Sequence, residues 1–138
     1  MLALSSKQSA QCRIVPIELA GLGQNNNEFS VEYIERAVDG DDSTFANAAF
    51  WGAGQGIRYV LPEVMNIGKA RLVADCYDGP SWGDCRLLIN GISTISIPVG
   101  SGKQERIWRG KVATSEVVIL EYARTRIYTL ELWEHVCD

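Results

Sequence analysis

The chain consists of short apolar runs separated by glycine, proline, asparagine and aspartate. Residues 117–122, VVILEY, are rich in β-branched side chains, and residues 92–99, ISTISIPV, mix apolar with small polar positions. Both features are typical of β-strands. The predicted strands are residues 12–19, 29–34, 56–62, 69–76, 85–90, 92–98, 105–112, 116–122 and 127–134. A sustained 3.6-residue apolar stripe is missing from the sequence, and at most one helical turn is expected, at residues 33–38.

The connections between these runs favour antiparallel pairing. Asn90-Gly91 separates two predicted strands, and this dipeptide favours a tight hairpin because both turn residues must adopt positive φ. The polar segment GQNNNE, residues 23–28, is predicted to be a loop. The sequence therefore predicts an all-β sandwich or barrel. With 138 residues it suits one domain, placed at residues 12–138 after an N-terminal extension of residues 1–11.

Charge and hydropathy narrow the function classes. A net charge of -4 argues against a general nucleic-acid binder, whose affinity depends on neutralising phosphates. No apolar run approaches the ~20 residues that a membrane-spanning helix needs, so membrane insertion is not expected. The opening MLALSSKQSAQC lacks the basic region of a signal peptide. We therefore expect removal of a leader or release by another route, such as the lysis that frees a virion.

Four cysteines allow three pairings. Their spacing matches no zinc motif, since there is no C-x-x-C and His135 is the only histidine. Cys12 and Cys137 flank the predicted domain, whereas Cys76 and Cys85 bracket the turn-rich segment YDGPSWGD. We expect disulfides Cys12–Cys137 and Cys76–Cys85. The alternative is four small buried thiols in a reducing compartment.

Residues 37–45, AVDGDDSTF, gather many oxygen atoms. Calcium takes six to eight oxygen ligands from carboxylates, hydroxyls and carbonyls, and a glycine lets the chain curl around an ion. The spacing is not that of an EF-hand. An Asx-rich turn without metal is the alternative. The candidate donors are the carbonyl of Ala37, the carboxylate of Asp39, an oxygen of Asp41 or Asp42, and both oxygens of Thr44.

The A-x-D-G-x-x-S/T-T pattern, about seven following strands and a closing strand IYTLELWEHVC resemble the discoidin superfamily. This group includes the coagulation-factor C-type domains and the galactose-binding carbohydrate modules. The resemblance covers most of the chain and implies an antiparallel jelly-roll β-sandwich, galactose-binding-domain-like, with a disulfide between the termini. It also implies a structural calcium held by the turn and by a glutamate of the last strand. Transferred to this sequence, the calcium ligands are Ala37, Asp39, Asp42, Thr44 and Glu131. Phe45 stands where the family often has tryptophan.

Binding is expected in the loops at one end of the sandwich. Sugar sites combine an aromatic face with side chains that hydrogen-bond hydroxyl groups. The segments ANAAFWGAGQG, CYDGPSWGDC and YARTR offer this mixture. Trp82 lies between Pro80-Ser81 and Gly83-Asp84, a context that favours exposure. The candidate carbohydrate-binding residues are Trp82, Tyr77, Asp78, Trp51, Asn47 and Arg124.

An enzymatic function is not expected. A single histidine removes most catalytic triads, and no serine or cysteine lies in a nucleophile elbow. A glycosidase-like carboxylate pair stays open, because 17 acidic residues allow many pairs. His135 follows the last predicted strand, away from the end loops where galactose-binding relatives often use a histidine.

The resulting hypothesis is a non-catalytic, lectin-like adhesion module with a structural calcium ion and with glycans as partners. The alternative is a virion structural, decoration or adaptor protein that contacts capsid or tail proteins through the same sandwich. Both place the protein outside the cell or on a virion surface. A third possibility, an intracellular interaction domain, predicts four free thiols.

Overall fold

The computed structural model describes residues 11–138 apart from residues 27–30, 51–55 and 122. The named strand pairs are all antiparallel. The elements are β1 (Cys12–Pro16), β2 (Gly23–Asn26), the 3-10 helix η2 (Ile34–Val38), β3 (Ala46–Phe50), β4 (Gly56–Asp78), β5 (Asp84–Ile89), β6 (Ile92–Pro98), β7 (Lys103–Glu121) and β8 (Ala123–Cys137). Within the described residues, no helix has the length and apolar character needed to cross a lipid bilayer.

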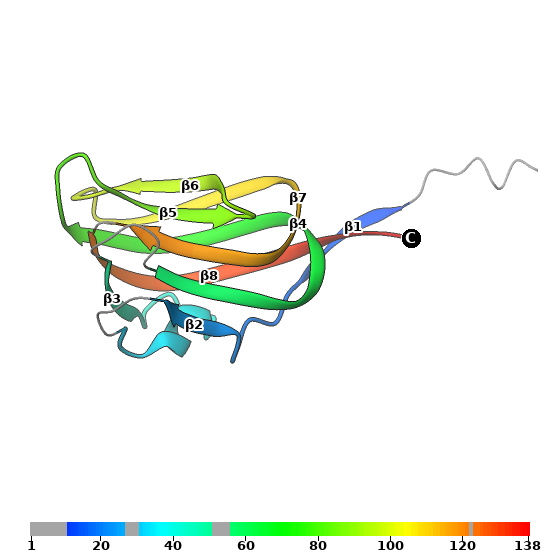
Figure 1. The fold of residues 1–138 in the computed structure, drawn as a ribbon, viewed down its shortest axis with the longest axis horizontal. Coiled ribbons are helices and arrows are strands. Elements are labelled where there is room, and N and C mark those ends of the chain that lie inside the picture. The colour runs from blue at the N-terminus through cyan, green and yellow to red at the C-terminus, as the bar shows by residue number, and fades with distance from the viewer. Residues whose placement is uncertain (1–10, 27–30, 51–55, 122) are drawn as a thin grey trace, which may run out of the picture.

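Two long strands organise the molecule. β4 and β7 pair from Gly56↔Leu120 to Asp75↔Lys103, with two shifts of register in between. Both strands bend and double back on themselves, so that the two ends of each strand lie at the same end of the molecule (Figure 1). The first half of β4 borders β2, and β7 continues there to β5 and β6. The second half of β4 borders β8, which carries β1 and β3. The predicted jelly-roll sandwich is therefore confirmed.

The core lies between these two layers. It is built from aliphatic side chains that alternate with more exposed residues along each strand, the pattern of a half-buried sheet. Ile57 and Leu72 come from the two halves of β4, and Leu87, Ile119 and Leu130 come from β5, β7 and β8. All five side chains are buried.

Several element boundaries differ from the sequence-based expectation. Predicted strands 56–62 and 69–76 form the single strand β4, and 105–112 and 116–122 form β7 apart from residue 122, which lies outside the described residues. Pro62 lies where the β4–β7 register shifts, so the proline marks a bend and not an end. A proline is tolerated there because it is not required to donate a ladder hydrogen bond.

Two short strands were missed. β2 occupies part of the segment predicted as a loop, because Gly23 to Asn26 pair with Tyr59 to Gly56 on β4. β3 was not predicted. The predicted strand 29–34 is wrong over its described part, where Glu32 makes only an isolated bridge to Asn47 and Ile34 begins η2. η2 confirms the expected helical turn.

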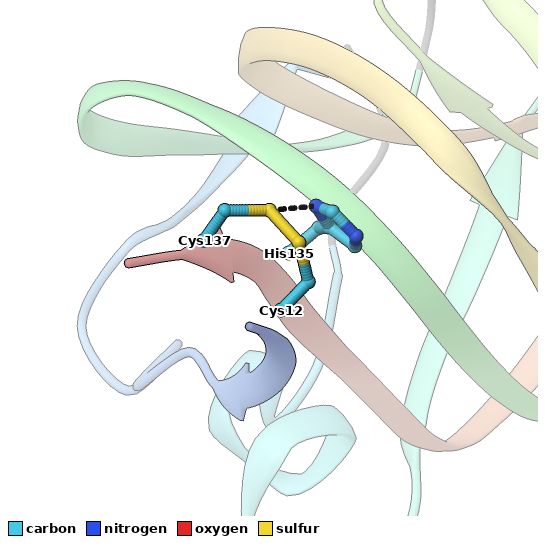
Figure 2. Close-up of side chains that lie close together, drawn as sticks. All are labelled: Cys12, His135 and Cys137. Carbon is cyan, nitrogen blue, oxygen red and sulfur yellow. Dashed lines mark hydrogen bonds between the residues drawn. A yellow bond between two sulfur atoms is a disulfide. The ribbon is translucent and has the colours of Figure 1, made fainter. Parts of the chain in front are cut away.

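The hairpin turn and both predicted disulfides are confirmed. Asn90 and Gly91 have φ values of 52° and 74°. Cys12 and Cys137 face each other across the β1–β8 pair, with their Cα atoms 4.1 Å apart. Figure 2 shows His135 beside this disulfide, with its Nδ1 atom 3.8 Å from Sγ of Cys137. His135 belongs to β8, so its expected place beyond the last strand was wrong.

Candidate functional site

The predicted binding residues that the structure describes lie at one end of the sandwich, where three strands meet. β4 ends at Asp78, which faces Arg124 on β8. β3 ends beside the start of β8, and the turn between β4 and β5 lies at this same end (Figure 1). Antiparallel pairing thus gathers residues that lie far apart in the sequence.

Tyr77 is the centre of the contacts at this end. Its hydroxyl donates a hydrogen bond to Oδ1 of Asn47 on β3, at 3.3 Å. The guanidinium carbon of Arg126 lies 4.3 Å from the centroid of the Tyr77 ring. Arg126 also pairs with Asp75 at 3.7 Å. The ring is therefore held in place from two neighbouring strands by a hydrogen bond and a cation–π contact.

Asp78 and Arg124 form a loose ion pair at the rim. Their charged groups are 3.9 Å apart, and their side chains are 60% and 54% exposed. Exposed pairs at this distance contribute little to stability, typically about 0–1 kcal/mol. Both groups can therefore turn to the hydroxyl groups of a ligand at small cost.

Trp82 confirms the expectation of exposure, because it is 74% exposed. It sits in a turn closed by a hydrogen bond from the Gly83 amide to the Pro80 carbonyl, at 2.8 Å. The Val99 amide in turn donates to the Gly83 carbonyl, at 3.1 Å. The turn is thus fixed against the neighbouring β6–β7 connection. Trp51, the other predicted tryptophan, lies outside the described residues.

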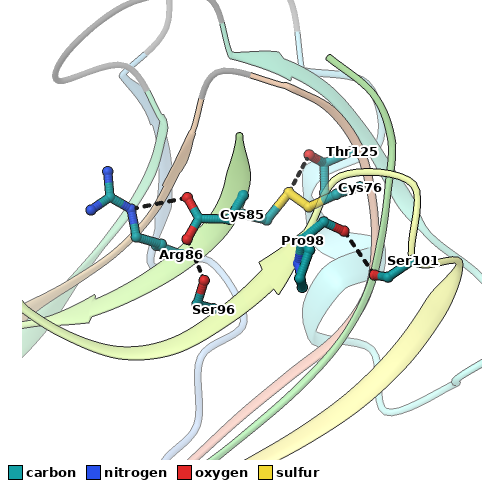
Figure 3. The surroundings of a disulfide bond; sticks show 8 residues. Cys76, Cys85, Arg86, Ser96, Pro98, Ser101 and Thr125 are labelled. Atoms are coloured by element: carbon teal, nitrogen blue, oxygen red, sulfur yellow. Dashed lines mark hydrogen bonds and ion pairs between the residues drawn. A yellow bond between two sulfur atoms is a disulfide. The ribbon is translucent and has the colours of Figure 1, made fainter. Parts of the chain in front are cut away.

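A buried disulfide joins the two strands that flank the Trp82 turn. Figure 3 shows Cys76 of β4 joined to Cys85 of β5, and both residues are fully buried. The Cys85 sulfur lies 2.9 Å from Oγ1 of buried Thr125 on β8. Thr125 lies between Arg124 and Arg126, so the bridge links the Trp82 turn to the strand that carries both arginines.

The aspartate-rich turn is closed by its own side chains. Oδ1 of Asp39 accepts a hydrogen bond from the Asp41 amide, and Oδ1 of Asp41 accepts from the Ser43 amide and hydroxyl. The Thr44 hydroxyl donates to Oδ2 of Asp39 at 2.5 Å. Gly40 has a φ of 77°, which glycine adopts without strain. The Ser43 hydrogen bonds lower the pKa of Asp41.

Arg71 connects the aspartate-rich turn with Glu131, the acid predicted on the last strand. Arg71 of β4 contacts Oδ2 of Asp42 at 2.5 Å and Oε1 of Glu131 at 2.8 Å. Its Nε atom lies 2.9 Å from Oε2 of Glu105 on β7. Hydrogen bonds from Arg71 and from Thr129 lower the pKa of Asp42, and the bonds to Asp42 raise the pKa of Arg71. The predicted proximity of Asp42 and Glu131 is therefore present.

Calcium binding stays a prediction, and the donor set does not fit it as predicted. The carboxylates of Asp42 and Glu131 are directed at a guanidinium group, while that of Asp39 is used inside the turn. In the described part of the chain, the three residues whose ligand atoms converge as a metal site would need are Cys12, His135 and Cys137. Two of these are joined in the disulfide.

Comparison with known proteins supports the fold. No protein-family model and no curated protein sequence match the chain. Among solved structures, it is similar to CBM32-1 from a family 31 glycoside hydrolase of Clostridium perfringens, with a TM-score of 0.57 and 12% identity over 84% of this chain and 96% of that one. It is also similar to chitosan-binding module 1 from a chitosanase/glucanase of Paenibacillus sp. IK-5, with a TM-score of 0.60 and 13% identity over 88% and 99% of the chains.

A third similar structure is the CBM32 of AlyQ in complex with 4,5-unsaturated mannuronic acid, with a TM-score of 0.58 and 12% identity over 86% and 97% of the chains. This chain has the fold of these carbohydrate-binding modules. The resemblance to galactose-binding-like domains is thus confirmed for the fold, over most of the chain. At identities of 12–13%, the ligands of these modules cannot be assigned to this chain.

Two arginines at these sites were not among the predicted site residues. Arg126 has the same orientation as Arg124 because strand side chains alternate, and the segment YARTR contained that signal. Arg71 is a charged residue in the apolar segment KARLVADC, where alternation places it on the outer face. Its partners could not be inferred from that position.

Proposed function

We propose that the chain is a non-catalytic carbohydrate-binding module whose glycan binds at the end formed by β3, β4 and β8. The observation that carries this proposal is the exposed Trp82 at the same end of the sandwich as a cluster of polar side chains, on a fold shared with carbohydrate-binding modules. Asn47, Tyr77, Asp78 and Arg124 all belong to this end. Five of the six sequence-predicted residues thus contribute to the proposed site.

The chemistry of these groups suits a sugar ring. The Trp82 indole offers a flat apolar surface on which the C–H face of a pyranose stacks. The Asp78 carboxylate accepts hydrogen bonds from hydroxyl groups, and the Arg124 guanidinium donates them. Because these two groups pair only loosely, a ligand competes with a weak contact.

The similar structures suggest which ligands to test. One is described as a chitosan-binding module, and another was solved with 4,5-unsaturated mannuronic acid. Chitosan presents amines and mannuronate presents a carboxylate. The end of this chain carries Arg124 and Arg126 together with Asp75 and Asp78, a balance that favours hydrogen bonding to neutral sugars over either charged polymer.

A binding function without catalysis agrees with the arrangement of the titratable groups. His135 lies beside the terminal disulfide, at the far end of β8 from Arg124. Near the proposed site, Asp75 and Asp78 are each paired with an arginine. Two disulfides suit an oxidising, extracellular location.

The test is a glycan array followed by isothermal titration calorimetry with the best neutral, amino and uronic oligosaccharides. We expect Trp82→Ala to weaken binding at least about tenfold, which corresponds to about 1.4 kcal/mol. Ile92→Ala is the control, because Ile92 is 52% exposed but follows the hairpin turn at the opposite ends of β5 and β6. Unchanged binding by Trp82→Ala would overturn the proposed site.

An adhesion role follows if the bound glycan belongs to a cell surface. The alternative of a virion adaptor predicts no glycan binding and a stable complex with a capsid or tail protein. Size-exclusion chromatography with such proteins distinguishes it from the carbohydrate-binding proposal.

A further inference from the structure

We infer that Arg71 supplies, from within the chain, the cation that the family resemblance assigns to calcium. The function of that cation is to fasten the turn of residues 39–44 to the outer face of the sheet. In this chain the fastening group is a guanidinium on β4, so the junction is complete without a metal ion.

The geometry around Arg71 is that of an enclosed cation. Three carboxylates approach it from three separate elements: Asp42 from the turn, Glu105 from β7 and Glu131 from β8. The shortest contact of each carboxylate is with a different guanidinium nitrogen, at 2.5, 2.9 and 2.8 Å respectively, and Asp42 also accepts from Nη1 at 3.3 Å. The Arg71 side chain is only 19% exposed. Its planar fork therefore uses all three nitrogen positions, an arrangement that an ammonium group would not reproduce.

A guanidinium and a calcium ion cannot share this position. Calcium would need the carboxylates of Asp42 and Glu131, which already contact the guanidinium, and two positive centres within about 4 Å repel strongly. Deprotonation of Arg71 cannot relieve this repulsion, because the guanidinium stays charged at any accessible pH. Inside the turn, both carboxylate oxygens of Asp39 and one of Asp41 already accept hydrogen bonds.

A second cation reinforces the same junction. The ammonium group of Lys103 donates a hydrogen bond to the backbone carbonyl of Asp42, at 2.7 Å. The same ammonium lies 3.9 Å from the centroid of the Tyr128 ring, which packs against Phe45 at a centroid distance of 5.2 Å. Phe45 directly follows the turn. Both the carboxylate and the carbonyl of Asp42 are thus bound to cationic side chains of the sheet.

The test compares calcium responses of the natural chain and an Arg71→Ala variant. For the natural chain we expect the same melting temperature in chelator and in about 5 mM calcium chloride, and no calcium binding by titration calorimetry. Arg71→Ala should lower the melting temperature in chelator by about 5–10 °C, because three carboxylates are left facing each other. Calcium should restore part of that loss.

Arg58→Ala is the matched control. Arg58 lies on the same strand and pairs with one carboxylate, that of Glu116 at 3.4 Å, so its loss should be small and independent of calcium. Calcium stabilisation of the natural chain would overturn the inference, and so would an Arg71→Ala variant that folds but ignores calcium. If Arg71→Ala does not fold, Arg71→Lys is measured in its place. It should be destabilised because the ammonium cannot reach all three acids, and equal stability would contradict the inference.

Discussion

The hydroxyl of Thr129 on β8 donates a hydrogen bond of 2.5 Å to the carboxylate of Asp42, although 87 residues separate the two in the sequence. Thr129 is fully buried, whereas Asp42 belongs to an exposed turn. The bond therefore ties a surface turn directly to the last strand. Together with Arg71 it makes Asp42 the residue through which the turn is attached to the sheet.

The stability of the protein should depend on pH through Asp42. Arg71 and Thr129 hold the pKa of Asp42 below its ordinary value near 3.8 in the folded state. The stabilisation from the ionised carboxylate is therefore fully present well above pH 4 and is lost as the pH falls through the lowered folded pKa. Asp42→Asn should reduce the free energy of unfolding at neutral pH, and its difference from the natural chain should shrink below about pH 4.

Urea unfolding at neutral pH and at about pH 3 measures this difference. Asp138→Asn is the control. Its ion pair with Arg13 is exposed, at 69% and 57% for the two side chains, so its loss should change the free energy of unfolding little at either pH. A deficit for Asp42→Asn that stays constant across this pH range would contradict the assignment.

The buried hydroxyl of Tyr59 should cost stability. Tyr59 is fully buried, and its hydroxyl has no hydrogen-bond partner within the described residues. Burial raises the pKa of Tyr59 well above its usual range. Tyr59→Phe should therefore stabilise the protein by about 1 kcal/mol, since an unsatisfied buried polar group is removed.

Tyr77→Phe provides the opposite case in the same measurement. It loses the hydrogen bond to Asn47 and should destabilise the protein by about 0.5–1.5 kcal/mol. Chemical denaturation of both variants and of the natural chain measures whether each substitution raises or lowers the free energy of unfolding. Equal destabilisation of the two variants would show that the Tyr59 hydroxyl is satisfied.

The two disulfides should separate stability from binding. Replacing Cys76 and Cys85 together opens a loop of sequence separation 9, which should cost about 2–3 kcal/mol. It should also weaken glycan binding, because the bridge supports the Trp82 turn. Replacing Cys12 and Cys137 should reduce stability while leaving affinity unchanged, since this bridge joins the termini.

Calorimetric titration and urea unfolding of both double variants make the comparison. Unchanged affinity after loss of the inner bridge would show that the turn is held by its backbone hydrogen bonds alone. A loss of affinity from the outer pair would place the ligand away from the proposed end.

Much of the architecture was visible in the sequence. Alternating and β-branched runs predicted most of the strand positions, since burial of one sheet face imposes a period of two. Asn90-Gly91 predicted the hairpin, because few other residues accept positive φ at both positions. The flanking positions of Cys12 and Cys137 and the short loop between Cys76 and Cys85 predicted the disulfide pairing.

The limits of the sequence appear where a structure depends on a distant partner. β2 is polar and became a strand only because β4 offers an edge to pair with. The bends of β4 and β7 could not be distinguished from strand ends, because proline and glycine interrupt a local pattern in either case. Arg126 belongs to the candidate segment YARTR but was not selected as a site residue, because its contact with Tyr77 forms only after β4 and β8 pair.

By itself, the sequence predicted an all-β sandwich or barrel, a pairing of the four cysteines and the residue types available for binding. Tertiary structure alone decided that the aspartate turn meets the last strand through Arg71. The physical reason is that the two outcomes depend on interactions over different separations in the sequence. Hydrophobic period and turn preference act between neighbours in the chain, whereas the partner of a charged group is chosen by strand register over many tens of residues.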